Sequence, residues 1–191
     1  MTRVFRGYAA TALLLMMTGC ATVPMGTPSP TLEGLQAIRG ATYLALAVGD
    51  FQVDPTADPS IDRSVNARSV RLVPPESDSF SRHLRACFRK QLEAAGKYSA
   101  ASATAIDGWL TANELHAAGT STGNGRVAAR IRVVRDGRVL LEKPFEARAE
   151  WPATFNGFEA IPAAMTEYTT LYRKLVEQVL ADPEIVRAAS P

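Results

Sequence analysis

The first twenty residues decide how much of this 191-residue chain can take part in a fold. Arg3 and Arg6 precede an uncharged run of apolar and small residues over positions 7–17. A helix that spans a bilayer needs about 20 apolar residues, whereas the apolar core of a secretory signal needs only about 7–15. The run has the shorter length, so we predict that residues 1–19 are a signal peptide and lie outside the folded domain.

The predicted signal ends in Met17-Thr18-Gly19-Cys20, a large apolar residue followed by two small residues and a cysteine. This motif resembles the lipobox of bacterial lipoproteins, which implies cleavage before Cys20 and transfer of a diacylglyceryl group to its thiolate. Ala21 follows the cysteine. In Gram-negative lipoproteins an aspartate there usually means retention at the inner membrane, so the resemblance implies an outer-membrane anchor on the periplasmic side. The alternative is a cysteine that follows an ordinary signal by coincidence.

The residues after Cys20 show neither helical nor strand periodicity. Prolines and glycines recur among Ser and Thr at positions 21–40, and a flexible coil of this length reaches on the order of 25 Å. We predict that residues 20–40 are a lipidated cysteine and a flexible Pro-rich tether. Residues 41–185 then form a single α+β domain, and residues 186–191 form a tail.

Hydrophobic periodicity beyond the tether predicts a strand, a helix, three strands and a second helix. The strands are expected at 43–53, with a bulge at Gly49, and at 106–117, 127–134 and 139–149, and the helices at 80–95 and from about Pro162 to Asp182. Residues 54–75 are expected to be a long connection. The order β-α-β-β-β-α predicts an α+β fold: a mainly antiparallel four-stranded sheet with two helices on one face.

The turn between the last two strands decides which side chains share a face. A two-residue loop, Asp136-Gly137, would place the apolar residues of the two strands on opposite faces, because one step of register exchanges the faces of a strand. A loop of three residues that adds Arg135 pairs Val133 with Val139 and keeps them together, so we predict the longer loop. That register places Arg130 opposite Glu142 and Arg126 opposite Glu146, so we predict two cross-strand ion pairs.

Basic residues gather on the helix predicted over residues 80–95. They are candidates for binding the phosphates of acidic lipid or lipopolysaccharide through charge-assisted hydrogen bonds. An ordinary solvated helix face is the alternative. The residues are Arg82, Arg85, Arg89 and Lys90.

Aromatic residues concentrate between the last strand and the last helix without helical or strand period. They either cap the core or form an exposed patch for a protein partner or an acyl chain. Our hypothesis is a partner-binding edge made by Trp151, Phe155 and Phe158.

The net charge and the lack of recognisable catalytic motifs argue against nucleic-acid binding and enzyme activity. The chain has 21 Lys and Arg against 19 Asp and Glu, and removal of Arg3 and Arg6 leaves 21 − 2 = 19 of each sign. This balance provides no large positive electrostatic field that could hold a nucleic acid. His83 and His116 stand outside any recognisable catalytic or metal-binding motif, so we expect no enzyme activity, no metal and no cofactor. Cys87, on the apolar stripe of its helix, is interpreted as a small buried hydrophobe.

The lipobox, the proline-rich segment and the β-α-β-β-β-α order together resemble small lipoproteins of the Gram-negative envelope. The plan is similar to that of the ABC-transporter auxiliary lipoproteins and of the lipopolysaccharide-assembly lipoprotein. The resemblance implies a non-enzymatic accessory or assembly module with an envelope protein partner, linked to lipid or envelope transport. The alternative is an independent binder of a small ligand or lipid, with an enzyme third. The residues that carry the resemblance are 17–20, 80–84, 107–110, 135–138 and 180–185.

Overall fold

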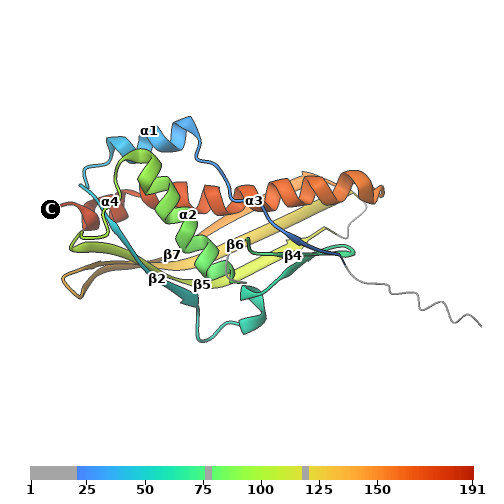
Figure 1. Ribbon diagram of the computed structural model, residues 1–191, viewed down its shortest axis with the longest axis horizontal. Helices are drawn as coiled ribbons and strands as arrows, with labels where there is room; N and C mark the ends of the chain where they lie inside the picture. The colour runs from blue at the N-terminus through green and yellow to red at the C-terminus, as the bar shows by residue number, and fades with distance from the viewer. Residues whose placement is uncertain (1–20, 76–78, 118–120) are drawn as a thin grey trace, which may run out of the picture.

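A computed structural model describes residues 21–75, 79–117 and 121–191 (Figure 1). The predicted signal peptide, residues 1–19, and Cys20 lie outside the described residues. In chain order the elements are β1 (Ala21–Pro24), α1 (Leu32–Gly40), β2 (Ala47–Val53), the 3-10 helix η1 (Pro59–Asp62), β3 (Val65–Ala67), β4 (Val70–Val73), α2 (Phe80–Ala95), β5 (Thr104–His116), β6 (Thr122–Arg135), β7 (Arg138–Pro152), α3 (Gly157–Ala181) and α4 (Pro183–Ala189).

The main sheet has four strands in the order β2-β5-β6-β7. Strands β5, β6 and β7 run antiparallel to one another, but β2 is parallel to β5. The reason is the connection, because α2 returns the chain along the sheet between β2 and β5 and a crossover of this kind leaves two strands parallel. The sheet is therefore mixed. The expectation of a mainly antiparallel sheet holds for three strands and is corrected for β2.

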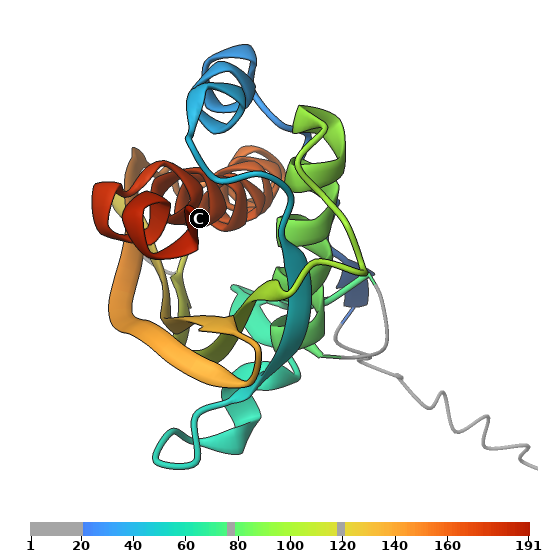
Figure 2. The same ribbon diagram turned by 90° about the vertical axis from the view of Figure 1, so that its left-hand side faces the viewer.

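Helices α2 and α3 cover one face of this sheet, as the pattern predicts. Helix α2 packs on β2 and β5, while α3 packs on β6 and β7. Figure 2 shows the sheet curving beneath this helical layer, with α1 outside α2 and α3 on the side away from the sheet. The core lies between the sheet and the two helices, where Leu84, Phe88, Ile131 and Leu175 are fully buried.

Helix α2 occupies the predicted range because its signals are local. The Ser79 hydroxyl accepts from the Arg82 amide and caps the N-terminus. Gly96 ends the helix with φ 71°, the left-handed conformation that glycine adopts without a steric penalty. The predicted bulge is also present, since the pairing of β2 with β5 shifts between Val48 and Phe51.

The segment expected to be a flexible tether is instead part of the folded domain. Strand β1 pairs in parallel with β4, starting at Ala21 opposite Val70, and β4 also pairs with β3 to make a second, three-stranded sheet. Met25 and Ile38 are buried in the core. The tether prediction is wrong because single apolar residues, too irregularly spaced to show a period, find positions in a core made by other elements.

Helix α1 is attached to α3 by a polar contact. The amide and hydroxyl of Thr31, the N-cap of α1, donate to Oε1 of Glu177 at 3.1 and 2.8 Å. Arg173 holds the other carboxylate oxygen at 3.0 Å. A side chain at Gly34 would overlap Glu177. The connection 54–75 is likewise structured, since it contains η1, β3 and β4.

The β6–β7 turn has two residues, not three. Asp136 and Gly137 both have positive φ, 50° and 77°, as a tight hairpin turn requires. A register shift after this turn pairs Val133 with Leu141 and returns the apolar residues to one face. The three-residue prediction is wrong because a bulge in β7 corrects the register. The ion pairs exist but are diagonal: Arg130 to Glu142 at 3.2 Å and Arg126 to Glu146 at 2.7 Å.

The C-terminal helices extend beyond the predicted limits. Helix α3 begins at Gly157 rather than near Pro162, because the Asn156 side chain accepts from the Phe158 amide at 3.1 Å and caps it. Residues expected to be a tail form most of α4, with Ala189 buried. Asp182 joins the two helices and pairs with Lys143 of β7 at 2.9 Å.

Candidate functional site

The face of the main sheet opposite α2 and α3 is polar, and its charged side chains form a connected network. Basic and acidic residues alternate across β5, β6 and β7, so the face has both signs of charge in fixed positions. We call this surface, together with Trp109, the polar face. Its ion pairs join Arg126 to Glu114 and Glu146, Arg130 to Asp54 and Glu142, Arg132 to Asp107, and Arg148 to Glu146.

The network lowers the pKa of two of its carboxylates, Glu146 and Asp54. Hydrogen bonds from Arg148 and Arg126 lower the pKa of Glu146 to about 2. Hydrogen bonds from the Thr56 hydroxyl and amide, together with the nearby Arg130 guanidinium, lower the pKa of Asp54. Charge-assisted hydrogen bonds of this kind restrict the side chains in geometry as well as in protonation.

Trp109 is the aromatic centre of the polar face. It projects from β5 beside β6, and the guanidinium carbons of Arg130 and Arg132 lie 4.7 and 4.6 Å from its ring centroid. Both arginines are also ion-paired, with Asp54 and Asp107 at 2.7 and 2.8 Å. The ring therefore contacts two oriented cations, an arrangement worth roughly 0.5–1 kcal/mol per contact at exposed sites.

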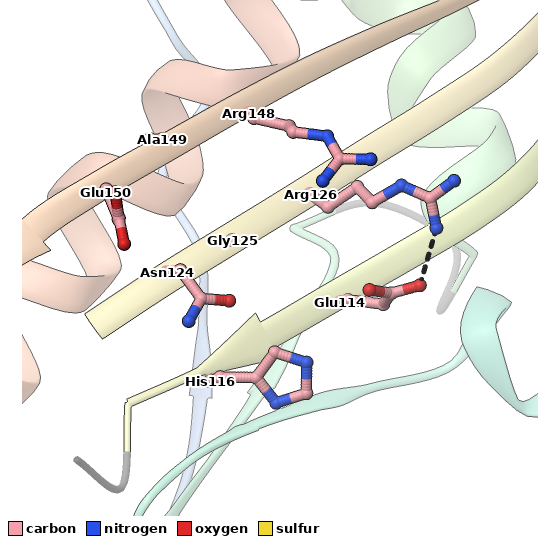
Figure 3. Close-up of a pocket in the computed structure, with 8 residues that line it drawn as sticks. All are labelled: Glu114, His116, Asn124, Gly125, Arg126, Arg148, Ala149 and Glu150. Carbon is pink, nitrogen blue, oxygen red and sulfur yellow. Dashed lines mark hydrogen bonds and ion pairs between the residues drawn. The ribbon is translucent and has the colours of Figure 1, made fainter. Parts of the chain in front are cut away.

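A hollow of about 390 Å³ opens at the far end of the polar face, where β5 ends and β6 begins. Figure 3 shows Arg126 and Arg148 on one side of it, with His116, Asn124 and Glu150 around the other, and the dashed contact joins Arg126 to Glu114. Gly125 and Ala149 complete the lining. Because donors and carboxylates alternate around it, the hollow suits a polar group or a polypeptide rather than an acyl chain.

The four basic residues of α2 predicted as an interaction site differ in their contacts. Arg85 donates to the Gly49 carbonyl at 2.6 Å and so caps the bulge of β2. Arg89 pairs with Glu93 at 2.7 Å and lies over the ring of Tyr98. Arg82 is exposed and Lys90 half-buried. Two of the four side chains are thus engaged within the domain, which favours the solvated-face alternative.

The aromatic segment divides into one core residue and two exposed ones. Trp151 is 6% exposed and packs against Gly123, where a side chain would overlap the indole ring. Phe155 and Phe158 are 86% and 93% exposed. Trp151 therefore belongs to the core, Phe155 and Phe158 are exposed, and the hypothesis of a partner-binding edge stays a prediction.

The two histidines differ in burial. His83 is fully buried in α2, against Tyr172 at 5.0 Å between ring centroids and with Nε2 at 3.6 Å from the sulfur of Cys87, which is also buried. His116 is exposed at the end of β5. The described residues hold no group of three or more His, Cys, Asp or Glu side chains that could bind a metal ion.

Sequence reasoning missed the polar face as a unit. Trp109 and Arg132 belong to no recognisable sequence motif, and their contact depends on the pairing of β5 with β6. The available signal was the alternation itself, since polar residues recur at alternate positions of three long strands. Among the described helices, none is both long enough and apolar enough to cross a membrane.

No protein-family model and no curated protein sequence matches this chain. Solved structures do match. A Xanthomonas campestris protein of the family DUF330 is 15% identical, with 84% of this chain and 95% of that chain covered and a TM-score of 0.51. A Caulobacter crescentus CB15 protein, described as a lipoprotein candidate, is 8% identical, with 83% and 98% covered and a TM-score of 0.43. The first of these shows a shared fold.

Proposed function

We propose that this protein is a lipoprotein of the Gram-negative outer membrane, anchored through acyl chains on Cys20 and facing the periplasm. It acts without catalysis, as an accessory module that docks an envelope protein partner in lipid or envelope transport. The resemblance of residues 17–20 to a lipobox supports the anchor, and the fold shared with a DUF330 protein is compatible with it.

The observation that carries the docking role is the polar face. Trp and Arg are the residue types most enriched at energetically important positions of protein interfaces, and here one Trp and two Arg are held together on a sheet face. Trp109 is only half-buried, so part of the ring is available to a partner. Fixed charges of both signs around it supply specificity and register.

Replacement of Cys20 tests the anchor. We expect the wild-type chain to incorporate radiolabelled palmitate and to fractionate with the outer membrane, and Cys20→Ala to do neither, because the thiol is the site of acyl transfer. Ala21→Asp should keep the acylated chain at the inner membrane, because an aspartate after the lipidated cysteine usually means retention there in Gram-negative lipoproteins. Ala21 is exposed, so the change leaves the fold intact. Equal palmitate in wild type and Cys20→Ala contradicts the proposal.

A photo-crosslinking residue on the polar face tests docking. Arg148 has a 69% exposed side chain beside the hollow, and Gln178 is an exposed α3 position suited as the matched control. We expect a discrete envelope-protein adduct from position 148 that is absent from position 178. Trp109→Ala should abolish the adduct without unfolding the domain. Identical adducts from both positions, or an adduct unaffected by Trp109→Ala, contradict the docking role.

The hollow favours a second candidate, an independent binder of a small polar ligand. Its size lies at the lower end of the roughly 300–1,000 Å³ typical of ligand pockets. Mass spectrometry of small molecules released from the purified protein distinguishes the two. A stoichiometric polar ligand lost in Arg126→Ala supports the binder, and its absence together with the position-148 adduct supports docking.

A further inference from the structure

Two phenylalanines project into solvent at one end of the domain. Phe155 and Phe158 are the most exposed large apolar side chains of the described residues. Full burial of such a ring is worth roughly 1.5–3 kcal/mol, so the folded domain gains nothing from placing two of them in water. We call Phe155 and Phe158 the aromatic pair.

The backbone that carries the aromatic pair is held firmly in place. The Phe155 carbonyl accepts from the Arg68 guanidinium at 2.9 Å, and the neighbouring Thr154 carbonyl accepts from the same group. The Phe158 amide donates to the Asn156 side chain at the first turn of α3. The rings are therefore presented outward by an ordered backbone.

The beginning of the mature chain lies at the same end. Ala21 is the first residue of β1 and pairs with Val70, two residues after Arg68 in the β3–β4 turn, and Arg68 in turn binds the backbone of the aromatic pair. Figure 1 shows the blue strand β1 and the orange beginning of α3 at the end of the molecule opposite the C-terminus. Cys20 precedes Ala21 by one peptide unit, about 3.8 Å between Cα atoms.

We propose that the aromatic pair inserts into the phospholipid bilayer beside the acylated Cys20 and fixes the orientation of the domain on the membrane. The inference rests on the proposed anchor. Because β1 begins at Ala21, no flexible tether separates the acyl chains from the domain, and this end is held at the headgroups. Two exposed aromatic rings at that depth supply the second membrane contact that strengthens anchoring by acyl chains.

A fluorescent label that reports its environment tests the insertion in the full, acylated protein. Phe155→Cys and Phe158→Cys chains are labelled with a nitrobenzoxadiazole group and reconstituted into phosphatidylethanolamine–phosphatidylglycerol vesicles that contain brominated acyl chains. Leu44→Cys is the matched control, because Leu44 is also a strongly exposed apolar residue, at 73%. We expect a blue shift and loss of most emission at 155 and 158, with aqueous emission and little quenching at 44.

Other results distinguish a failure of membrane insertion by the aromatic pair from a failure of the proposed acyl anchor on Cys20. Mass spectrometry of the N-terminal peptide reports acylation of Cys20, and a chain without acyl groups overturns the proposed anchor and this inference together. An acylated, vesicle-bound chain with unquenched labels at 155 and 158 overturns the inference alone. So does equal quenching at 44, or a label at 155 and 158 shielded from both brominated lipid and aqueous iodide, which would place a protein partner on the pair.

Discussion

Asn113→Ala is expected to lower the free energy of unfolding by about 3–5 kcal/mol, because buried polar groups left without partners cost roughly 1–3 kcal/mol each. Asn113 is 5% exposed on the inner side of β5. Its Oδ1 accepts from the hydroxyls of Tyr168 and Tyr172, the latter at 2.9 Å, and its Nδ2 donates to the Ile61 carbonyl at 2.7 Å. One amide therefore joins β5, α3 and η1, and its removal takes a partner from the two tyrosine hydroxyls of α3 and from the Ile61 carbonyl of η1.

Urea unfolding measures this effect, with Asn124→Ala as the control. Asn124 is exposed on β6, so its removal should change stability by no more than about 0.5 kcal/mol. In a chain that carries Tyr168→Phe and Tyr172→Phe, Asn113→Ala should cost less, since the hydroxyls that need the amide are gone. Equal losses for Asn113→Ala and Asn124→Ala would show that the network contributes nothing to stability.

The second large effect is a loss of stability on acidification that depends on His83. Burial, with a smaller contribution from Lys90, lowers the pKa of His83 to about 4. In the unfolded chain an imidazole titrates near ~6.5. The unfolded state therefore binds the proton first as the pH falls, and stability is lost from about pH 6.5 down to about pH 4. The full loss is about 3 kcal/mol, which follows from roughly 1.4 kcal/mol per pKa unit.

Comparison with His83→Leu isolates this contribution from the carboxylates that titrate in the same range. We expect wild type to lose about 3 kcal/mol more than His83→Leu between pH 7.5 and pH 4. His116→Gln should behave as wild type, because His116 is exposed. Chemical unfolding at a series of pH values gives the curves. Parallel curves for wild type and His83→Leu would mean that His83 titrates alike in both states.

The elements that sequence reasoning located share one property, which is a signal carried by neighbouring residues. Helix α2 follows from apolar spacing over residues 80–95 and a glycine at its end. The three long antiparallel strands follow from alternation and from a turn at Asp136-Gly137. The predicted loop length was wrong because a bulge in β7 just after the turn, not the turn itself, keeps the two apolar faces together.

The candidate site was predictable only in pieces. The pairs Arg126 with Glu146 and Arg130 with Glu142 were expected from cross-strand spacing, and both exist. The contact of Trp109 with Arg130 and Arg132 was not expected, because it depends on the register of β5 against β6. Arg85 shows the reverse case, in which a residue typical of a binding surface caps backbone carbonyls of β2.

The sequence by itself predicted an export signal and a resemblance of residues 17–20 to a lipobox, and it determined one long amphipathic helix and an alternating three-strand meander. Each of these depends on residues close together in the chain. Only the tertiary structure decided that β2 runs parallel to β5, that Asn113 joins three elements, and that residues 21–40 belong to the domain. Short strands and single buried residues have too little local pattern to be recognised, because their stability comes from partners distant in sequence. That difference turns a domain expected on a tether into one whose first strand begins directly after Cys20.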